Sequence, residues 1–226
     1  MGWLPNRRQY PRVTSRLGIV LVASLAGCGY SGGEALFMTG LFQRPKVKAE
    51  FKLTDGPVAV IVDDFGELCH WPEAPGVLEQ RVVDELSKHH AATRLISPMK
   101  IKTMRQSYPE FDKRGFRELG RLLGADQVVA MEVRAFEASV EVRTIGAAAR
   151  MSVAVKVIDA REQAEGDRVR LWPAGRAGET VAVELDGSQV NRAKTQDAIL
   201  EKLATALAEK IARKFYERPM ADFEKE

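Results

Sequence analysis

The sequence is poor in cysteine and histidine, with two cysteines and three histidines in 226 residues. It lacks a CxxC pair, a serine-centred nucleophile elbow, a Walker loop and a GxGxxG loop. These absences remove the recognisable thiol, acyl-transfer and nucleotide chemistries. The sequence therefore predicts a non-enzymatic protein with no bound cofactor and no metal.

Long apolar runs are also lacking. No stretch approaches the roughly 18 consecutive apolar residues that a membrane-spanning helix needs. Apolar residues make up 45% of the chain and charged residues 29%, which is ordinary for a globular protein that buries a core. The length suits one domain of moderate size or two small ones.

Positive charge in excess is confined to the start of the chain. The formal net charge is +3, yet Arg7, Arg8, Arg12 and Arg16 all precede Cys28, and no acidic residue does. Without them the chain has about 30 basic against 31 acidic residues, which is close to neutral. No basic stripe with interleaved aromatic residues follows, so we expect no nucleic-acid partner.

The first 28 residues are arranged as a signal peptide. A basic segment at 7–16 precedes a run of about ten apolar residues at 17–26, too short to span a membrane. Leu25, Ala26, Gly27 and Cys28 then resemble the lipobox of bacterial lipoproteins. The resemblance implies cleavage between Gly27 and Cys28 and lipid, including palmitate, on the Cys28 thiol. The alternatives are a plain secretory peptide with a chance cysteine and a short buried helix; Arg7 and Arg8 could also mark twin-arginine export.

The lipobox defines the expected organisation of the chain. We expect a signal peptide at 1–27, a lipidated Cys28 and tether at 28–47, one α/β periplasmic domain at 48–219 and a tail at 220–226. No aspartate follows Cys28, so the expected location is the outer membrane, facing the periplasm. Cys69 is then a lone thiol, either buried as a small apolar residue or reactive at the surface.

Apolar periodicity predicts a mixed β-sheet with packed helices. Continuous apolar runs at 58–62 and 127–133 predict buried strands, the alternation at 149–158 predicts a third, and shorter strands are expected at 94–97, 169–172 and 180–185. Helical spacing predicts helices at 76–90 and 99–107 and one that Asp112 caps, with Phe116, Leu119, Leu122 and Leu123 on one face and Gly124 at its end. A long amphipathic C-terminal helix of about 23 residues carries Ile199, Leu203, Leu207, Ile211 and Phe215.

Four stretches resemble a known superfamily: VAVIVDDF at 58–65, LEQRVVDEL at 78–86, FRELGRLLGADQVVAMEV at 116–133 and MSVAVKVIDA at 151–160. They resemble the periplasmic lipoproteins that include the curli-secretion channel protein CsgG, the exopolysaccharide protein PelC and the peptidoglycan-synthase activator LpoB. These share the fold of the TolB N-terminal domain. The resemblance implies that fold, no enzymatic activity and a possible homo-oligomer. The turn at 161–167 lacks the Thr-Gly pair that these families place there.

The strongest candidates for a chemical site follow the first strand. Asp63 and Asp64 lie where α/β proteins often place sites, and with Glu67 and His70 they could hold a divalent cation or act as an acid/base pair. The spacing matches no metal motif, so hydrated turn residues are the favoured interpretation. His89 and His90 are expected to end a helix, where cationic side chains suit the helix dipole.

Two further features allow alternatives. Residues 130–143 and 151–157 alternate in polarity, as in a membrane hairpin of an oligomeric export channel or in a sheet with one buried face. Arg134 and Glu137 interrupt the apolar face and favour the sheet. Trp71 and Trp172 are either anchors for a partner or edges of the core.

The sequence as a whole favours a lipid-anchored, non-enzymatic envelope protein. The anchor is the lipid on Cys28, and the expected partner is another envelope component, most simply a protein. One alternative is a subunit of an oligomeric outer-membrane export channel. The other is a metal-dependent envelope enzyme that uses Asp63, Asp64 and His70.

Overall fold

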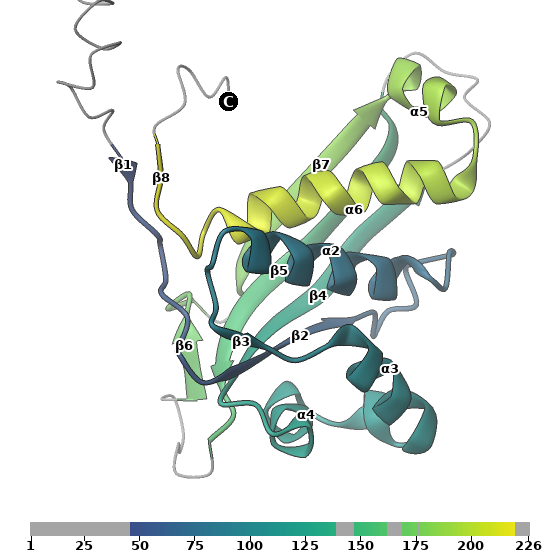
Figure 1. Ribbon diagram of the computed structural model, residues 1–226. Helices are drawn as coiled ribbons and strands as arrows, with labels where there is room; N and C mark the ends of the chain where they lie inside the picture. The colour runs from purple at the N-terminus through teal and green to yellow at the C-terminus, as the bar shows by residue number, and fades with distance from the viewer. Residues whose placement is uncertain (1–45, 139–146, 162–168, 176, 220–226) are drawn as a thin grey trace, which may run out of the picture. The chain divides into compact units, whose positions relative to one another are not determined.

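The computed structural model describes residues 46–138, 147–161, 169–175 and 177–219 (Figure 1). The chain divides into a unit that ends at Pro45 and a folded unit that begins at Lys46, to which all described residues belong. The signal peptide, Gly27, Cys28, most of the tether and the tail lie outside the described residues, as do the tip of the 130–158 hairpin and most of the 161–167 turn. The statements about them stay predictions.

A mixed six-stranded sheet forms the centre of the folded unit, as the sequence predicts. Its order is β3-β2-β4-β5, and β6 and β7 both pair with β5. The strands β2 and β3 are parallel, as are β2 and β4, whereas β5 runs antiparallel to β4, β6 and β7. The strand bounds are β2 Pro57–Asp63, β3 Arg94–Leu95, β4 Gln127–Ala138, β5 Ala147–Asp159, β6 Arg170–Trp172 and β7 Glu179–Asp186.

The described residues contain five helices, and four of them flank the sheet in two unequal layers (Figure 1). The larger core joins α2 and α6 to one face of all the long strands. The smaller core joins α3 and α4 to the other face of β2 and β4. The helix bounds are α2 Ala74–Lys88, α3 Pro98–Ser107, α4 Phe116–Leu123, α5 Gly187–Ala193 and α6 Gln196–Ala212.

The burial of each strand explains its sequence pattern. In β2, Val60 belongs to the larger core and Ile61 to the smaller one, so both faces are covered and the strand is apolar throughout. In β5, Met151 and Val153 lie in the larger core and Arg150 is exposed, whereas Ser152 and Ala154, which point to the other face, are also buried. The alternate residues of the described part of the 130–158 region thus point into the larger core of the folded unit. No helix among the described residues is long and apolar enough to cross a membrane.

The helix that precedes β4 differs from the prediction at its start. Asp112 does not cap it, because Asp112 lies in a separate 3₁₀ turn, Phe111–Lys113, and Arg114 is extended. The helix α4 begins after Gly115 instead. Leu122 is 37% exposed, because the buried face follows positions 116, 119, 120 and 123 and position 122 falls beside it.

The end of α4 matches the prediction. Gly124 has φ of 72°, a left-handed conformation that suits glycine, and its N–H bonds to the carbonyl of Arg121. The Asp126 N–H then bonds to the Pro57 carbonyl at 2.7 Å and starts the pairing of β4 with β2.

The last helix is shorter than expected. It has 17 residues and ends at Ala212, so Phe215 lies in the turn that follows, though it is still buried. Its buried face is also wider than predicted, because Leu200 and Ala204 join the predicted positions. After that turn, β8 (Arg218–Pro219) pairs with β1 (Lys46–Val47), so the two ends of the folded unit lie side by side.

Candidate functional site

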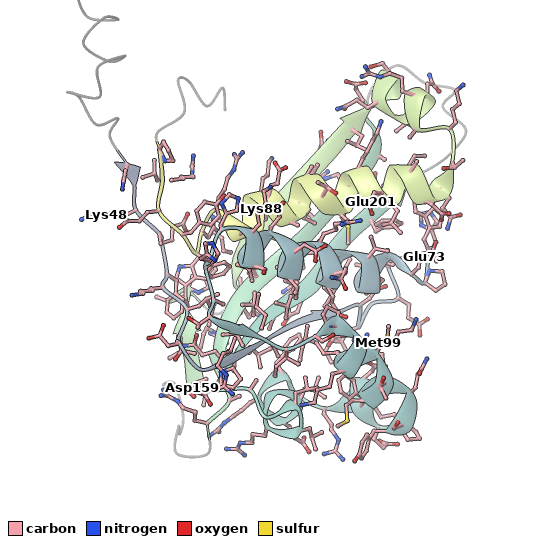
Figure 2. The ribbon with its side chains drawn as sticks, viewed as in Figure 1. Lys48, Glu73, Lys88, Met99, Asp159 and Glu201 are labelled. Carbon is pink, nitrogen blue, oxygen red and sulfur yellow. The ribbon has the colours of Figure 1, made fainter. Side chains whose placement is uncertain are left out.

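A cleft of about 940 Å³ opens at the carboxyl end of β2. Its walls are the β2–α2 loop, the first half of α2 and one side of α3. Glu73, Met99 and Glu201, labelled in Figure 2, mark three of the segments that meet around it: the start of α2, the start of α3 and the middle of α6. Ligands of α/β proteins commonly bind at the carboxyl ends of strands, and this volume is within the range of ligand sites.

The cleft exists because β3 is short. It pairs with β2 only at Pro57 and Val58, so in the described structure no strand covers the end of β2 on that side. At this edge, two side chains bond to the backbone groups of Val62 that no described strand pairs with. Its N–H donates to Glu79 Oε1 at 2.9 Å, and its carbonyl accepts from Arg105 Nη2 at 3.3 Å.

Glu79 and Arg105 form an ion pair at the floor of the cleft, with Nη2 3.5 Å from Oε1. Glu79 is 2% exposed, and this burial raises the pKa of its carboxyl although Arg105 and the Val62 N–H lower it. Burial lowers the pKa of Arg105, but Glu79 and Asp112 outweigh it and the guanidinium stays charged. Asp112 Oδ1 accepts from Arg105 Nε at 2.8 Å, and the guanidinium carbon lies 5.4 Å from the centre of the Phe111 ring.

Asp63 lies in the cleft without a partner in the described part of the chain. Desolvation raises the pKa of its carboxyl to about 6, and the nearby charges of Asp112, Glu132 and Asp64 add to this rise while Arg105 opposes it. An ionised carboxylate that is half-buried, repelled and unpaired is poised to accept a cation or a hydrogen-bond donor.

Asp64 forms the turn that follows β2. Its Oδ1 accepts from the Leu68 N–H and its Oδ2 from the Cys69 N–H, both at 2.8 Å. Its carbonyl also accepts from the Glu67 N–H at 2.9 Å. With both oxygens engaged in this way, Asp64 shapes the cleft mouth more than it offers a free ligand.

His70 is not brought together with the aspartates. Its Nε2 lies 3.0 Å from the Ala138 carbonyl at the end of β4, and its ring packs 5.1 Å from Phe136 and 5.4 Å from Trp71. It does not line the cleft that Asp63, Asp64 and Glu67 share. Among the described residues, no three His, Cys, Asp or Glu side chains are arranged to hold a metal ion.

The remaining candidates have structural surroundings. Cys69 is half-buried against the larger core, and desolvation, together with Asp64, raises the pKa of its thiol to about 12. Trp71 is a core residue, 7% exposed. Trp172 is half-buried and packs edge-on against Phe215 at 5.7 Å. His89 ends α2, as predicted, and stacks on Tyr216 at 4.0 Å.

Glu79 and Arg105 were not predicted from the sequence, and Asp112 was predicted only as a helix cap. The signal for Glu79 was a carboxylate beside Leu78 on the buried face of a predicted helix, where an acid needs a partner. The partner is 26 residues away on α3, and the pattern of either helix alone does not show it.

No known protein family matches the sequence, and no curated protein matches it. Several solved structures resemble the fold. They include lipoprotein GNA1162 from Neisseria meningitidis (12% identity, 69% of this chain and 97% of that chain, TM-score 0.43), the PelC dodecamer from Paraburkholderia phytofirmans (16%, 78% and 98%, 0.42) and the hypothetical protein CT253 from Chlamydia trachomatis (18%, 70% and 96%, 0.39). PelC is one of the proteins named in the sequence resemblance. Every TM-score is below 0.5, and the TolB-like and CsgG-like assignments stay predictions.

Proposed function

We propose that the protein is a lipid-anchored, non-enzymatic lipoprotein of the bacterial envelope, and that its folded domain binds another envelope component. The observation that carries this proposal is the run from Leu25 to Cys28, which closes an apolar segment of about ten residues and precedes a folded unit that begins at Lys46. Two or three acyl chains on one cysteine hold a protein stably on a membrane. In this proposal the domain faces the periplasm from the outer membrane.

The proposed mechanism is tethering. Lipid on Cys28 would confine the domain to the membrane surface, where its effective concentration toward other membrane components is high. The domain needs no catalytic step for this role. It needs a surface that recognises a partner, and the cleft at the end of β2 offers one, with a charged floor and an open mouth.

The test compares the full chain with its Cys28→Ser variant in a bacterial host. We expect the parent protein to fractionate with membranes and to incorporate an alkyne analogue of palmitate, and the variant to do neither while it still gives a folded thermal transition. Cys69→Ser is the matched control, because Cys69 lies within the folded unit and should keep both properties. If Cys28→Ser still fractionates with membranes, lipid on Cys28 is not the anchor.

The native mass of the detergent-extracted protein separates a tethered binder from a channel subunit. A monomer or dimer agrees with the proposal. A ring of many subunits would contradict it and would favour a pore built from the 130–158 hairpin.

A further inference from the structure

We propose that the cleft at the end of β2 binds a basic, partly apolar peptide segment of a partner protein, with a Lys or Arg side chain held between Asp63 and Glu79 and its apolar neighbours on Phe65 and Met99. This inference deepens the proposed function and rests on it, because it names the partner's chemistry at the site. Neither the tether nor the sequence motifs require it. It follows from the charges, the burial and the exposed apolar groups of the cleft.

The lining of the cleft carries more acid than base. Two of its three basic residues are already engaged: Arg81 with Glu201 at 2.6 Å and Arg105 with Asp112 at 2.8 Å. The third, Lys102, is exposed on α3. The seven acidic residues of the lining are Asp63, Asp64, Glu67, Glu73, Glu79, Asp112 and Glu201. A cationic ligand is therefore attracted, and an anionic one is repelled.

Glu79 adds an observation that is independent of this charge count. It is 2% exposed, and both hydrogen bonds that its carboxylate accepts within the described structure end on Oε1. Its Oε2 accepts none there, and it is not among the fully buried side-chain atoms without a partner, so this oxygen keeps some accessible surface. Since Glu79 lines the cleft, a donor that enters from the cleft can reach this oxygen.

Asp63 provides the second contact. It lies at the end of β2, it also lines the cleft, and its carboxylate has no partner in the described part of the chain. A guanidinium or ammonium group carries several N–H donors and can bond two carboxylates at once. Such a group would give Asp63 a hydrogen-bond partner and would reach the Oε2 of Glu79, whose Oε1 is already bonded to Val62 and Arg105.

The mouth of the cleft can contact apolar residues that flank the basic residue of the peptide. Phe65 is 69% exposed and Met99 is 66% exposed, and both line the cleft. Aromatic and methionine side chains are enriched in protein interfaces, and methionine adapts to different partners. Pro72, Pro75 and Pro98 line the same walls, and their fixed φ lowers the conformational entropy that binding would cost.

Other ligand classes fit less well. A divalent cation needs a set of oxygen or nitrogen ligands, and the described residues hold no group of three suitable side chains. A nucleic acid would bring phosphates to a predominantly acidic surface. A small amine would contact the carboxylates but not the exposed Phe65 and Met99. A peptide with basic and apolar residues can contact both the carboxylates and these two side chains.

The test measures peptide binding to the full chain in a non-ionic detergent by fluorescence anisotropy. The probe is a fluorescein-labelled peptide of sequence GRLRLG, compared with GELELG and GRSRSG. We expect GRLRLG to bind most tightly. We expect Asp63→Asn and Met99→Ser each to weaken it by about tenfold, the scale of one lost charged or apolar contact. Peptide binding to the Glu79→Gln variant tests the second carboxylate, once thermal unfolding has shown that this variant is folded. Glu110→Gln is the control, because Glu110 is exposed and outside the cleft lining.

Several results would overturn the proposal. One is equal binding of GRLRLG and GELELG, and another is unchanged binding in both Asp63→Asn and Met99→Ser. Tight binding of calcium alone that Asp63→Asn removes would assign the cleft to a metal. These outcomes leave the lipid anchor untouched, since membrane fractionation of Cys28→Ser tests that separately. Conversely, specific GRLRLG binding in a protein without lipid would keep this inference and reject the tether.

Discussion

Glu79 accepts a hydrogen bond from the Val62 N–H at 2.9 Å, so a helix side chain occupies a position where a neighbouring strand would normally pair. Arg105 completes the arrangement by donating to the Val62 carbonyl. The two side chains are themselves paired, so the end of β2 is satisfied by one acid and one base from different helices. The sheet edge, the helix packing and the floor of the cleft therefore depend on the same contacts.

Replacing Glu79 should destabilise the fold strongly. In Glu79→Ala, the Val62 N–H loses its acceptor and Arg105 loses its buried counter-charge, so we expect the free energy of unfolding to fall by about 3–5 kcal/mol. Glu79→Gln keeps an acceptor for Val62 and should cost less. Urea denaturation at pH 7 measures both. The exposed Glu110→Ala should change the free energy by less than about 0.5 kcal/mol; an equally small effect of Glu79→Ala would contradict the role of the pair.

Asp63 should make the protein less stable as the pH rises, whereas a salt-bridged carboxylate makes a protein more stable as the pH rises. Its folded pKa of about 6 lies above the ordinary aspartate value of 3.8, so the folded state binds the proton more tightly. Its favourable contribution is complete below pH 3.8 and is lost as the pH rises through 6. Desolvation is the largest cause of the raised pKa. The charges of Asp112, Glu132 and Asp64 raise the pKa further, and the charge of Arg105 lowers it.

Asp63→Asn, which keeps the side chain neutral, should therefore stabilise the protein at pH 8 by a few degrees in Tm. The gain should shrink toward zero at pH 4, where the parent Asp63 is protonated as well. Thermal unfolding across this pH range measures the difference, and Glu110→Gln shows how much any surface carboxylate contributes. A constant difference at all pH values would mean that the Asp63 pKa is unshifted. A stabilising variant that also loses peptide binding is the pattern expected of a functional residue.

The sequence predicted the sheet because burial leaves a simple pattern. The apolar run at 58–62 is a strand covered on both faces, and the alternation around Met151 belongs to a strand whose apolar side chains, such as Met151 and Val153, face the larger core. The short strands β1 and β8 were not predicted, since each has two residues and forms only because Lys46 and Val47 meet Arg218 and Pro219. The helix α5 was also missed, because its start depends on a capping box between Asp186 and Gln189 in a seven-residue segment.

The candidate site was predicted only where its residues are related by closeness in the sequence. Asp63 was found because it follows an apolar strand, a relationship that is local in the sequence. Its most informative neighbours, Glu79 and Arg105, act through contacts between residues 26 positions apart. His70 was grouped with Asp63 by closeness in the sequence, but the turn that Asp64 forms separates them and His70 packs on Phe136.

Cys69 should react slowly with alkylating reagents while the protein is folded. Its thiol pKa of about 12, compared with the ordinary cysteine value of 9.0, leaves little thiolate at pH 8. We expect iodoacetamide to modify Cys69 in a Cys28→Ser background at least about tenfold more slowly in the native state than in urea. Asp64→Asn should raise the native rate, because the Asp64 charge contributes to the shift after desolvation. Equal native and unfolded rates would show that Cys69 is a reactive surface thiol.

Two helical glycines should respond oppositely to alanine. At Gly120 in α4, an added Cβ would lie 2.5 Å from Val128 Cγ2 and 2.6 Å from Ala160 Cβ, so the helix would have to move off the sheet. We expect Gly120→Ala to lower the free energy of unfolding by about 1–3 kcal/mol, as overpacked cores do. At Gly76 in α2 nothing lies within 4 Å of the added carbon, and Gly76→Ala should raise the free energy by about 0.5–1 kcal/mol. Urea denaturation of the two variants measures both changes. If Gly120→Ala were as stable as the parent protein, α4 would not pack on β4 as closely as the structure has it, and the smaller core behind the cleft would be looser than the contacts of Gly120 imply.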